Sequence, residues 1–148
     1  MQDFYSLHRL SLPDLTDSFA ASTIQMLRKD HALCTENFTA NVVCTCNTPD
    51  TSTSKNDVLS SFQEQVGASV TLETSEVTYG TISWMRITGI ILPTPETGLQ
   101  VSQVCYVATH ELQLISFVFS VALEKMDGLT EFAETYMQRV QYTPLATN

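Results

Sequence analysis

The sequence predicts a single α+β domain in which an antiparallel β-sheet carries two helices. The main observation is a run of four apolar, β-branched segments between residues 69 and 123, separated only by short turn-like stretches. Apolar side chains that recur every second residue are typical of strands, and strands joined by so few residues pair antiparallel. The second observation is that two segments with helical spacing, 54–67 and 127–140, lie before and after this run.

Four strands are expected inside the central run. In the first, Val70 and Leu72 lie on one face, with mostly hydroxyls and carboxylates on the other. The last two are separated only by residues 110–111, which leaves room for nothing but a tight hairpin. The fourth has the clearest apolar face, which runs from Ile115 to Leu123. The four expected strands are 69–78, 81–92, 99–109 and 112–123.

Three more strands are expected before the first helix. Residues 7–12 alternate weakly and end at a proline, and residues 38–46 are rich in β-branched side chains. Between them, the segment 15–31 fits either a helix or a strand, and we favour a strand for its second half. The predicted order is therefore three strands, a helix, four strands and a helix, all within one domain that spans residues 1–148.

The two helices are predicted from their ends as well as from their spacing. Ser54 or Asn56 can cap the first helix, and Gly67 stops it. The second begins after Asp127, and Pro144 closes it. The apolar faces are Val58, Leu59, Phe62 and Val66 in the first helix, and Phe132, Ala133, Tyr136, Met137 and Val140 in the second.

Composition narrows the classes of function. The 148 residues include 16 acidic and 7 basic side chains, so the net charge is −9 and the pI is near 4.5. An acidic protein repels phosphate backbones and anionic lipids, so we expect neither nucleic-acid binding nor membrane insertion. No apolar run reaches the roughly 20 residues of a membrane span. The N-terminus lacks a signal peptide, which predicts a cytoplasmic location, or an envelope location if a signal has been removed.

Several local patterns resemble one known group of proteins. They are an early strand that ends in Leu12-Pro13, the run 38–43 before a turn and helix, the strand 81–87, and a hairpin through Tyr106 and Val118. Together with the order of elements, they resemble the Mog/PsbP-like α/β/α sandwich, and within it the bacterial DcrB-like and LpqN/LpqT-like families. The resemblance implies an α/β/α sandwich. It carries over no catalytic residue, because these families share no catalytic motif.

No catalytic residue and no cofactor are predicted from the residues either. The sequence has no glycine-rich phosphate loop, no His-Glu-x-x-His and no Gly-x-Ser-x-Gly. In a strand, Cys44 and Cys46 share a face at roughly 6.5–7 Å, which is too far for a disulfide and poorly suited to shared zinc binding. We therefore expect them to pack as small apolar side chains. A thiol- or metal-dependent enzyme that uses both cysteines and a histidine is the alternative.

The hypothesis for binding rests on three aromatic residues. Trp84, the only tryptophan, belongs to the core if its ring faces the helices, and we favour this interpretation. If it faces the other way, Trp84, Tyr106 and Phe119 form an exposed patch that could receive an apolar segment of another protein. We therefore predict a non-enzymatic binding module for a protein partner, an adaptor or a chaperone-like protein. An envelope or lipoprotein-type domain that binds a small ligand or lipid is a further alternative.

Overall fold

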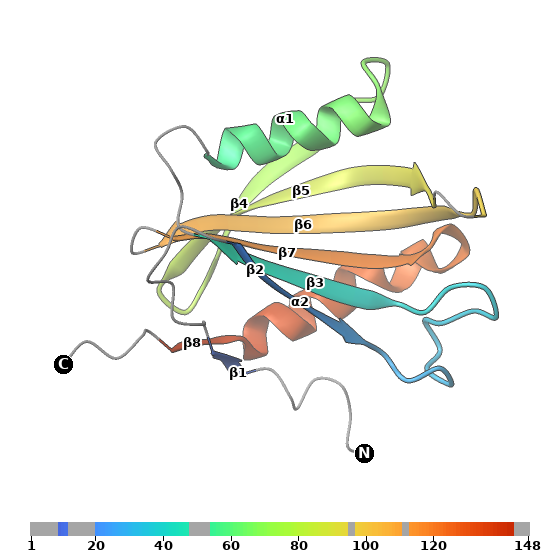
Figure 1. Cartoon of the computed structure of the whole chain (residues 1–148), viewed down its shortest axis with the longest axis horizontal. Coiled ribbons are helices and arrows are strands. Elements are labelled where there is room, and N and C mark those ends of the chain that lie inside the picture. Colours follow the sequence, from blue (N-terminus) through green and yellow to red (C-terminus); the bar gives the residue numbers. More distant parts are fainter. Residues whose placement is uncertain (1–8, 12–19, 48–53, 95–96, 111–112, 144–148) are drawn as a thin grey trace.

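We describe a computed structural model of the chain, which defines residues 9–11, 20–47, 54–94, 97–110 and 113–143. Figure 1 shows how its helices and strands are arranged. The elements follow in the order β1 (Arg9–Ser11), β2 (Ala20–Met26), β3 (Asn41–Asn47), α1 (Lys55–Val66), β4 (Glu73–Tyr79), β5 (Ile82–Pro93), β6 (Gln100–His110), β7 (Gln113–Ala122), the 3₁₀ helix η2 (Leu123–Gly128), α2 (Leu129–Arg139) and β8 (Gln141–Thr143).

Six strands form one antiparallel sheet in the order β2-β3-β7-β6-β5-β4. The predicted meander is confirmed, because β4, β5, β6 and β7 follow one another in the chain and lie side by side in the sheet. The register of β6 and β7 extends to the pair His110 and Gln113, as the predicted tight hairpin requires. The strand favoured for the second half of 15–31 is also confirmed, as β2. The two edges of this sheet are β2 and β4.

A second sheet was not predicted. It has two strands, β1 and β8, which pair parallel from Arg9 opposite Gln141 to Ser11 opposite Thr143. The three residues of β8 follow α2 after the single residue Val140, where the sequence predicts a helix that continues towards Pro144. Pro144 itself lies outside the described residues.

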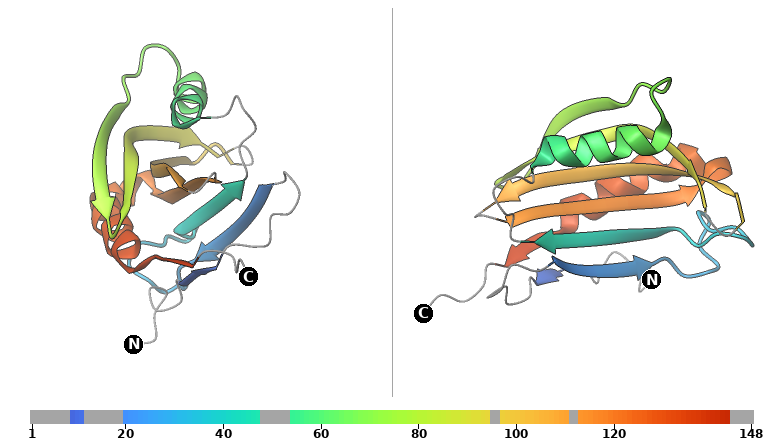
Figure 2. Two further views of the ribbon diagram at one scale, coloured as in Figure 1. Left: turned by 90° about the vertical axis from the view of Figure 1, so that its left-hand side faces the viewer. Right: turned by 45° about the horizontal axis from the view of Figure 1, so that its top comes forward.

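The two helices pack on opposite faces of the six-stranded sheet (Figures 1 and 2). Helix α1 contacts β5 and β6 on one face, and α2 contacts β6 and β7 on the other. Strand β6 is covered on both sides, so the adjacent side chains of Cys105 and Tyr106 are both fully buried although they point in opposite directions. The sheet therefore separates two cores, one beneath each helix.

A bulge in β5 keeps its apolar residues on the correct face. The register with β6 shifts between Ile87 and Ile90, and Gly89, which lies between them, has a φ of +91°. A β-bulge inserts one extra residue, and glycine adopts positive φ without steric cost. As a result Ile87 and Ile90, three residues apart, both pack in the core beneath α1.

The predicted ends of the first helix are confirmed. Ser54 is its N-cap: the Ser54 Oγ accepts a hydrogen bond from the Asp57 amide, and the Asp57 carboxylate accepts one from the Ser54 amide. Gly67 ends the helix with a φ of +97°. No described helix has the length and apolar character needed to cross a membrane.

The strand expected at 69–78 begins later than predicted. Strand β4 starts at Glu73, and Val70 lies before it with 37% of its surface exposed. The reason is a polar contact: the Gln63 side-chain amide donates hydrogen bonds to the carbonyls of Gly67 and Val70. These bonds hold residues 67–70 against the end of α1 and keep them out of the sheet.

Helix α2 has the predicted apolar stripe, but the segment before it differs. Strand β7 ends at Ala122, so Leu123, which was expected to extend its apolar face, begins η2 instead. The loop that contains Leu33 packs against the junction of η2 and α2, where a Cβ on Gly128 would lie 2.6 Å from Leu33 Cδ2. The buried residues of α2 are Leu129, Phe132, Ala133, Tyr136 and Met137.

Phe119→Ala should lower the free energy of unfolding by about 3–5 kcal/mol, because it removes a fully buried ring and leaves a cavity beneath α2. Phe62→Ala, on the half-buried face of α1, is the matched control and should cost about 1–2 kcal/mol. Denaturant unfolding followed by circular dichroism measures both values. Equal losses of unfolding free energy in the two variants would contradict the difference in burial between Phe119 and Phe62.

Candidate functional site

The structure brings the three predicted aromatic residues together, but in the core. Trp84 is only 2% exposed, and Tyr106 and Phe119 are fully buried. Their strands place them on the same face of the sheet, and α2 covers that face. The exposed aromatic patch is therefore wrong, and Trp84 occupies the core position that the favoured interpretation gives it.

Phe119 is the centre of the aromatic cluster beneath α2. Its ring makes edge-to-face contacts with Tyr106 at a centroid distance of 5.8 Å, with Phe132 at 5.4 Å and with Tyr136 at 5.2 Å. Edge-to-face pairs stabilise a core beyond the area that they bury. One of these three partners, Tyr106, belongs to the sheet and the other two belong to α2, so the cluster fixes the position of α2.

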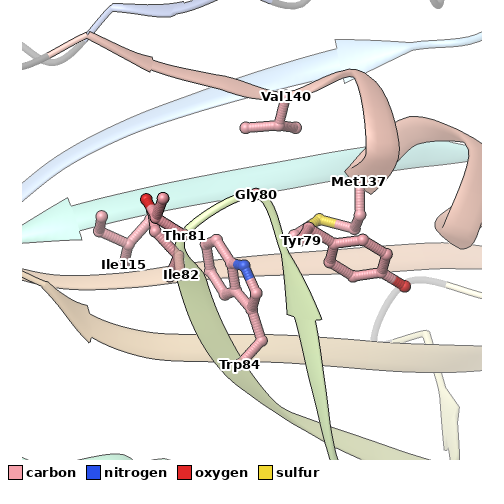
Figure 3. Close-up of a pocket in the computed structure, with 8 residues that line it drawn as sticks. All are labelled: Tyr79, Gly80, Thr81, Ile82, Trp84, Ile115, Met137 and Val140. Carbon is pink, nitrogen blue, oxygen red and sulfur yellow. The ribbon is translucent and has the colours of Figure 1, made fainter.

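A cavity of about 260 Å³ lies at one end of this cluster. It forms where the β4–β5 hairpin turns and the C-terminal end of α2 passes over the sheet. We call it the hairpin-end cavity. In Figure 3, Trp84 lies between Ile82 and Ile115 on one side and Tyr79 and Met137 on the other. The lining residues are Tyr79, Gly80, Thr81, Ile82, Trp84, Ile115, Met137 and Val140.

The walls of the hairpin-end cavity are largely apolar, and its polar groups are few. Ile115 and Met137 are buried behind it, whereas Gly80 and Thr81, in the hairpin turn, are exposed to solvent. Gly80 has a φ of +63°, which the tight turn requires and which a side chain would strain. The polar side-chain groups of the lining residues are the hydroxyls of Tyr79 and Thr81 and the indole N–H of Trp84, and in Figure 3 the Tyr79 hydroxyl points away from the other lining residues. An apolar wall with a few neutral polar groups is typical of a binding site.

An ion pair next to the cavity ties α2 to the sheet. The Arg86 Nη1 donates a hydrogen bond to Glu134 Oε2 at 3.1 Å, and the Arg86 Nε donates one to Ser75 Oγ at 3.2 Å. Three elements, β4, β5 and α2, therefore meet at this arginine. Tyr79 lines the cavity, and its ring lies 6.0 Å from the ring of Tyr106, the residue opposite Arg86 on the neighbouring strand.

The Tyr106 hydroxyl is buried and, among the described residues, has no hydrogen-bond partner. In the strand register, Tyr106 lies opposite Arg86 of the neighbouring strand β5. Burial raises the pKa of Tyr106, an effect that the Arg86 guanidinium only partly opposes, so the hydroxyl is neutral at physiological pH. A neutral buried phenol is a hydrogen-bond donor or acceptor and not a base, so this group fits binding better than proton transfer.

The cysteines do not assemble into a site in the described part of the chain. Cys44 packs in the core beneath α2, whereas Cys105 packs beneath α1 on the other face of the sheet. Cys34 lies in the loop after β2, where its Sγ accepts a hydrogen bond from the Ala40 amide and donates one to the Arg28 carbonyl. The side chain of Cys46 is outside the description. Nowhere in the described ranges do three or more His, Cys, Asp or Glu side chains group as metal ligands would.

Comparisons with known proteins identify the fold alone. No family model matches the chain, and no curated protein is significantly similar to it. A crystal structure of PA94 from Pseudomonas aeruginosa, a protein of unknown function for which a regulatory role has been suggested, is similar with a TM-score of 0.61. That similarity covers 93% of this chain and 92% of the other, at 11% sequence identity. The antiparallel α+β fold is thus shared with a bacterial protein over nearly the full length of both chains.

Cys105 should resist alkylation in the folded protein, because burial raises the pKa of its thiol to about 12 and the thiolate is the reacting species. At pH 8, iodoacetamide should modify the half-buried Cys34 at least roughly a hundredfold faster, as read by peptide mass spectrometry. Because the pKa is raised on folding, this thiol stabilises the fold below about pH 9, and the contribution is lost as the pH rises to about 12. Rapid labelling of Cys105 in folded protein at pH 8 would contradict its burial.

Proposed function

We propose that this protein is a non-enzymatic binding domain, an adaptor or chaperone-like protein, that holds a protein partner at the hairpin-end cavity. One apolar side chain of the partner enters the cavity beside Trp84. The observation that carries the proposal is an apolar cavity that opens at the exposed hairpin turn and ends against buried core residues.

The size of the cavity favours a side chain over a lipid. Sites for drug-sized ligands occupy about 300–1,000 Å³, and the hairpin-end cavity, at about 260 Å³, lies just below this range. A volume of this kind accommodates one bulky apolar side chain, whereas a lipid tail needs a longer channel. Buried anchors of this sort supply much of the affinity of a protein interface. A small ligand in the same cavity, as expected of an envelope-type domain, is the second candidate.

The chemistry around the cavity also supports binding. The charged side chains of Arg86 in β5 and Glu134 in α2 are paired with each other, and the buried hydroxyl of Tyr106 is neutral. The thiol alternative, which uses Cys44, Cys46 and a histidine, has less support, since Cys44 packs in the buried core beneath α2. We therefore assign no catalytic residue and no cofactor.

We further propose that the chain is a Mog/PsbP-like α/β/α sandwich, nearest to the DcrB-like and LpqN/LpqT-like families. Support comes from the antiparallel sheet, with α1 packed on one face and α2 on the other. Either a cytoplasmic or an envelope location is compatible with this proposal. Neither nucleic-acid binding nor membrane insertion is part of it, given a net charge of −9.

Thr81→Phe should block the cavity, because Thr81 lines it at its exposed end. Trp84 is the only tryptophan and also lines the cavity, so its fluorescence reports directly on an occupant. Titration of the wild-type protein with N-acetyl-leucinamide and N-acetyl-phenylalaninamide should change the emission of Trp84 to a saturable limit. The Thr81→Phe variant should bind each probe at least tenfold more weakly.

Ser83→Phe is the matched control, since Ser83 is exposed two residues further along the chain and does not line the cavity. It should bind like the wild-type protein. Decanoate, titrated in the same way, tests the second candidate: saturable binding of decanoate, but not of the amino-acid amides, would favour a lipid or small ligand. No emission change with any probe, or full binding by Thr81→Phe, would contradict a binding role for the cavity.

A further inference from the structure

We infer that the partner binds as an extended, positively charged segment that adds a seventh strand to the sheet along β4. This inference rests on the proposed function, because the side chain that enters the hairpin-end cavity would belong to the same segment. It goes further in naming the backbone geometry and the charge of the partner.

Strand β4 has the free edge that strand addition requires. It is the last strand of its sheet and, within the described residues, pairs only with β5. Residues 73–76 are all exposed, and no described helix contacts β4 closely enough to cover its outer edge. Peptides that extend a sheet gain main-chain hydrogen bonds along such an edge and gain specificity from the pockets beside it.

The hairpin turn determines which backbone groups are free. Residues Gly80 and Thr81 form a two-residue turn between the paired residues Tyr79 and Ile82. Residues that flank such a turn exchange hydrogen bonds with each other, and the bonded pairs then alternate along the ladder. The amides and carbonyls of Thr78, Glu76 and Thr74 therefore point to the free edge, whereas those of the intervening residues bond to β5. A partner strand would meet three donor and acceptor sets in succession.

The same strand leads into the hairpin-end cavity. Tyr79 is both the last residue of β4 and part of the cavity lining, and in Figure 3 the strand runs directly away from the turn at Gly80. A segment that bonds along β4 thus passes the cavity at one end. One of its side chains can enter the cavity there while the rest of the segment follows Thr78 towards Thr74.

Charge selects the partner and disfavours a second copy of this chain. Glu73 and Glu76 are exposed on β4 and contribute to the net charge of −9. Self-pairing of two β4 edges would bring these carboxylates close together, and charges on an edge strand commonly prevent such association. A segment with a lysine or arginine next to Glu76 on one face of the sheet, and another next to Glu73 on the other face, would instead form opposite-charge pairs across the strands. The occupant that fits is therefore a basic extended peptide with one bulky apolar residue.

Selection of a random dodecapeptide display library on the full chain, with depletion against the Thr81→Phe variant, tests this inference. Enriched peptides should be rich in lysine and arginine and should carry one bulky apolar residue. Thr78→Pro, which removes an outward amide but no bond to β5, should weaken the best peptide at least tenfold, measured by Trp84 fluorescence. Thr78→Val keeps the amide and should bind as the wild-type protein does. On binding, the amides of residues 74, 76 and 78 should gain protection from hydrogen exchange.

A second variant, which changes only exposed side chains, tests the same inference if the proline variant does not fold. The double variant Glu73→Lys, Glu76→Lys should lose basic peptides at least tenfold and gain affinity for their acidic counterparts. Enriched peptides that are neutral or acidic, or equal binding by Thr78→Pro and Thr78→Val, would overturn strand addition by a basic segment. If N-acetyl-leucinamide still binds in a way that Thr81→Phe abolishes, the cavity stands and only this inference fails. If no peptide and no amide binds, both fail.

Discussion

The contacts of Phe119 are the constraint on which the rest of this structure depends. Its ring meets Tyr106 from the sheet and both Phe132 and Tyr136 from α2, so it fixes how the helix lies over the strands. Beyond these rings, Met137 and the residues of the β4–β5 hairpin line the hairpin-end cavity between the same helix and sheet. The ion pair between Arg86 and Glu134 holds the two elements together beside that cavity. The candidate site is thus a consequence of how the aromatic core ends.

Burial on both faces limits where a partner can bind. Cys105 and Tyr106 are neighbours in β6, and both are fully buried because α1 covers one side of that strand and α2 the other. The centre of the sheet is therefore closed, which rules out an exposed patch of Trp84, Tyr106 and Phe119, the less favoured of the two interpretations of the sequence. What the fold leaves open includes an edge strand, β4, and the cavity at its end. The edge strand and the cavity meet at Tyr79, so a single partner segment could contact both.

Much of the fold could be predicted because its signals are local. The alternation of Phe117, Phe119 and Val121 and the helical spacing of Phe132 and Tyr136 each define an element within a dozen residues. The late start of β4 could not be predicted in this way, because it depends on hydrogen bonds from Gln63 to carbonyls that only the folded chain brings near. Strand β8 was missed for a similar reason: three residues pair with a segment more than 100 positions earlier in the chain.

The site was only partly accessible from the sequence. The sequence suggested that Trp84, Tyr106 and Phe119 could lie together, but alternation within a strand does not show which face a helix covers. The cavity joins residues from the β4–β5 hairpin, β7 and the end of α2, and no local pattern connects Tyr79 with Met137. The most direct test of its role is a measurement of intermolecular nuclear Overhauser effects between a selected peptide and the methyl groups of the protein. The account predicts contacts from the peptide's apolar side chain to Ile82 and Met137. Contacts only to Val43 and Val118, on the sheet face away from α2, would contradict it.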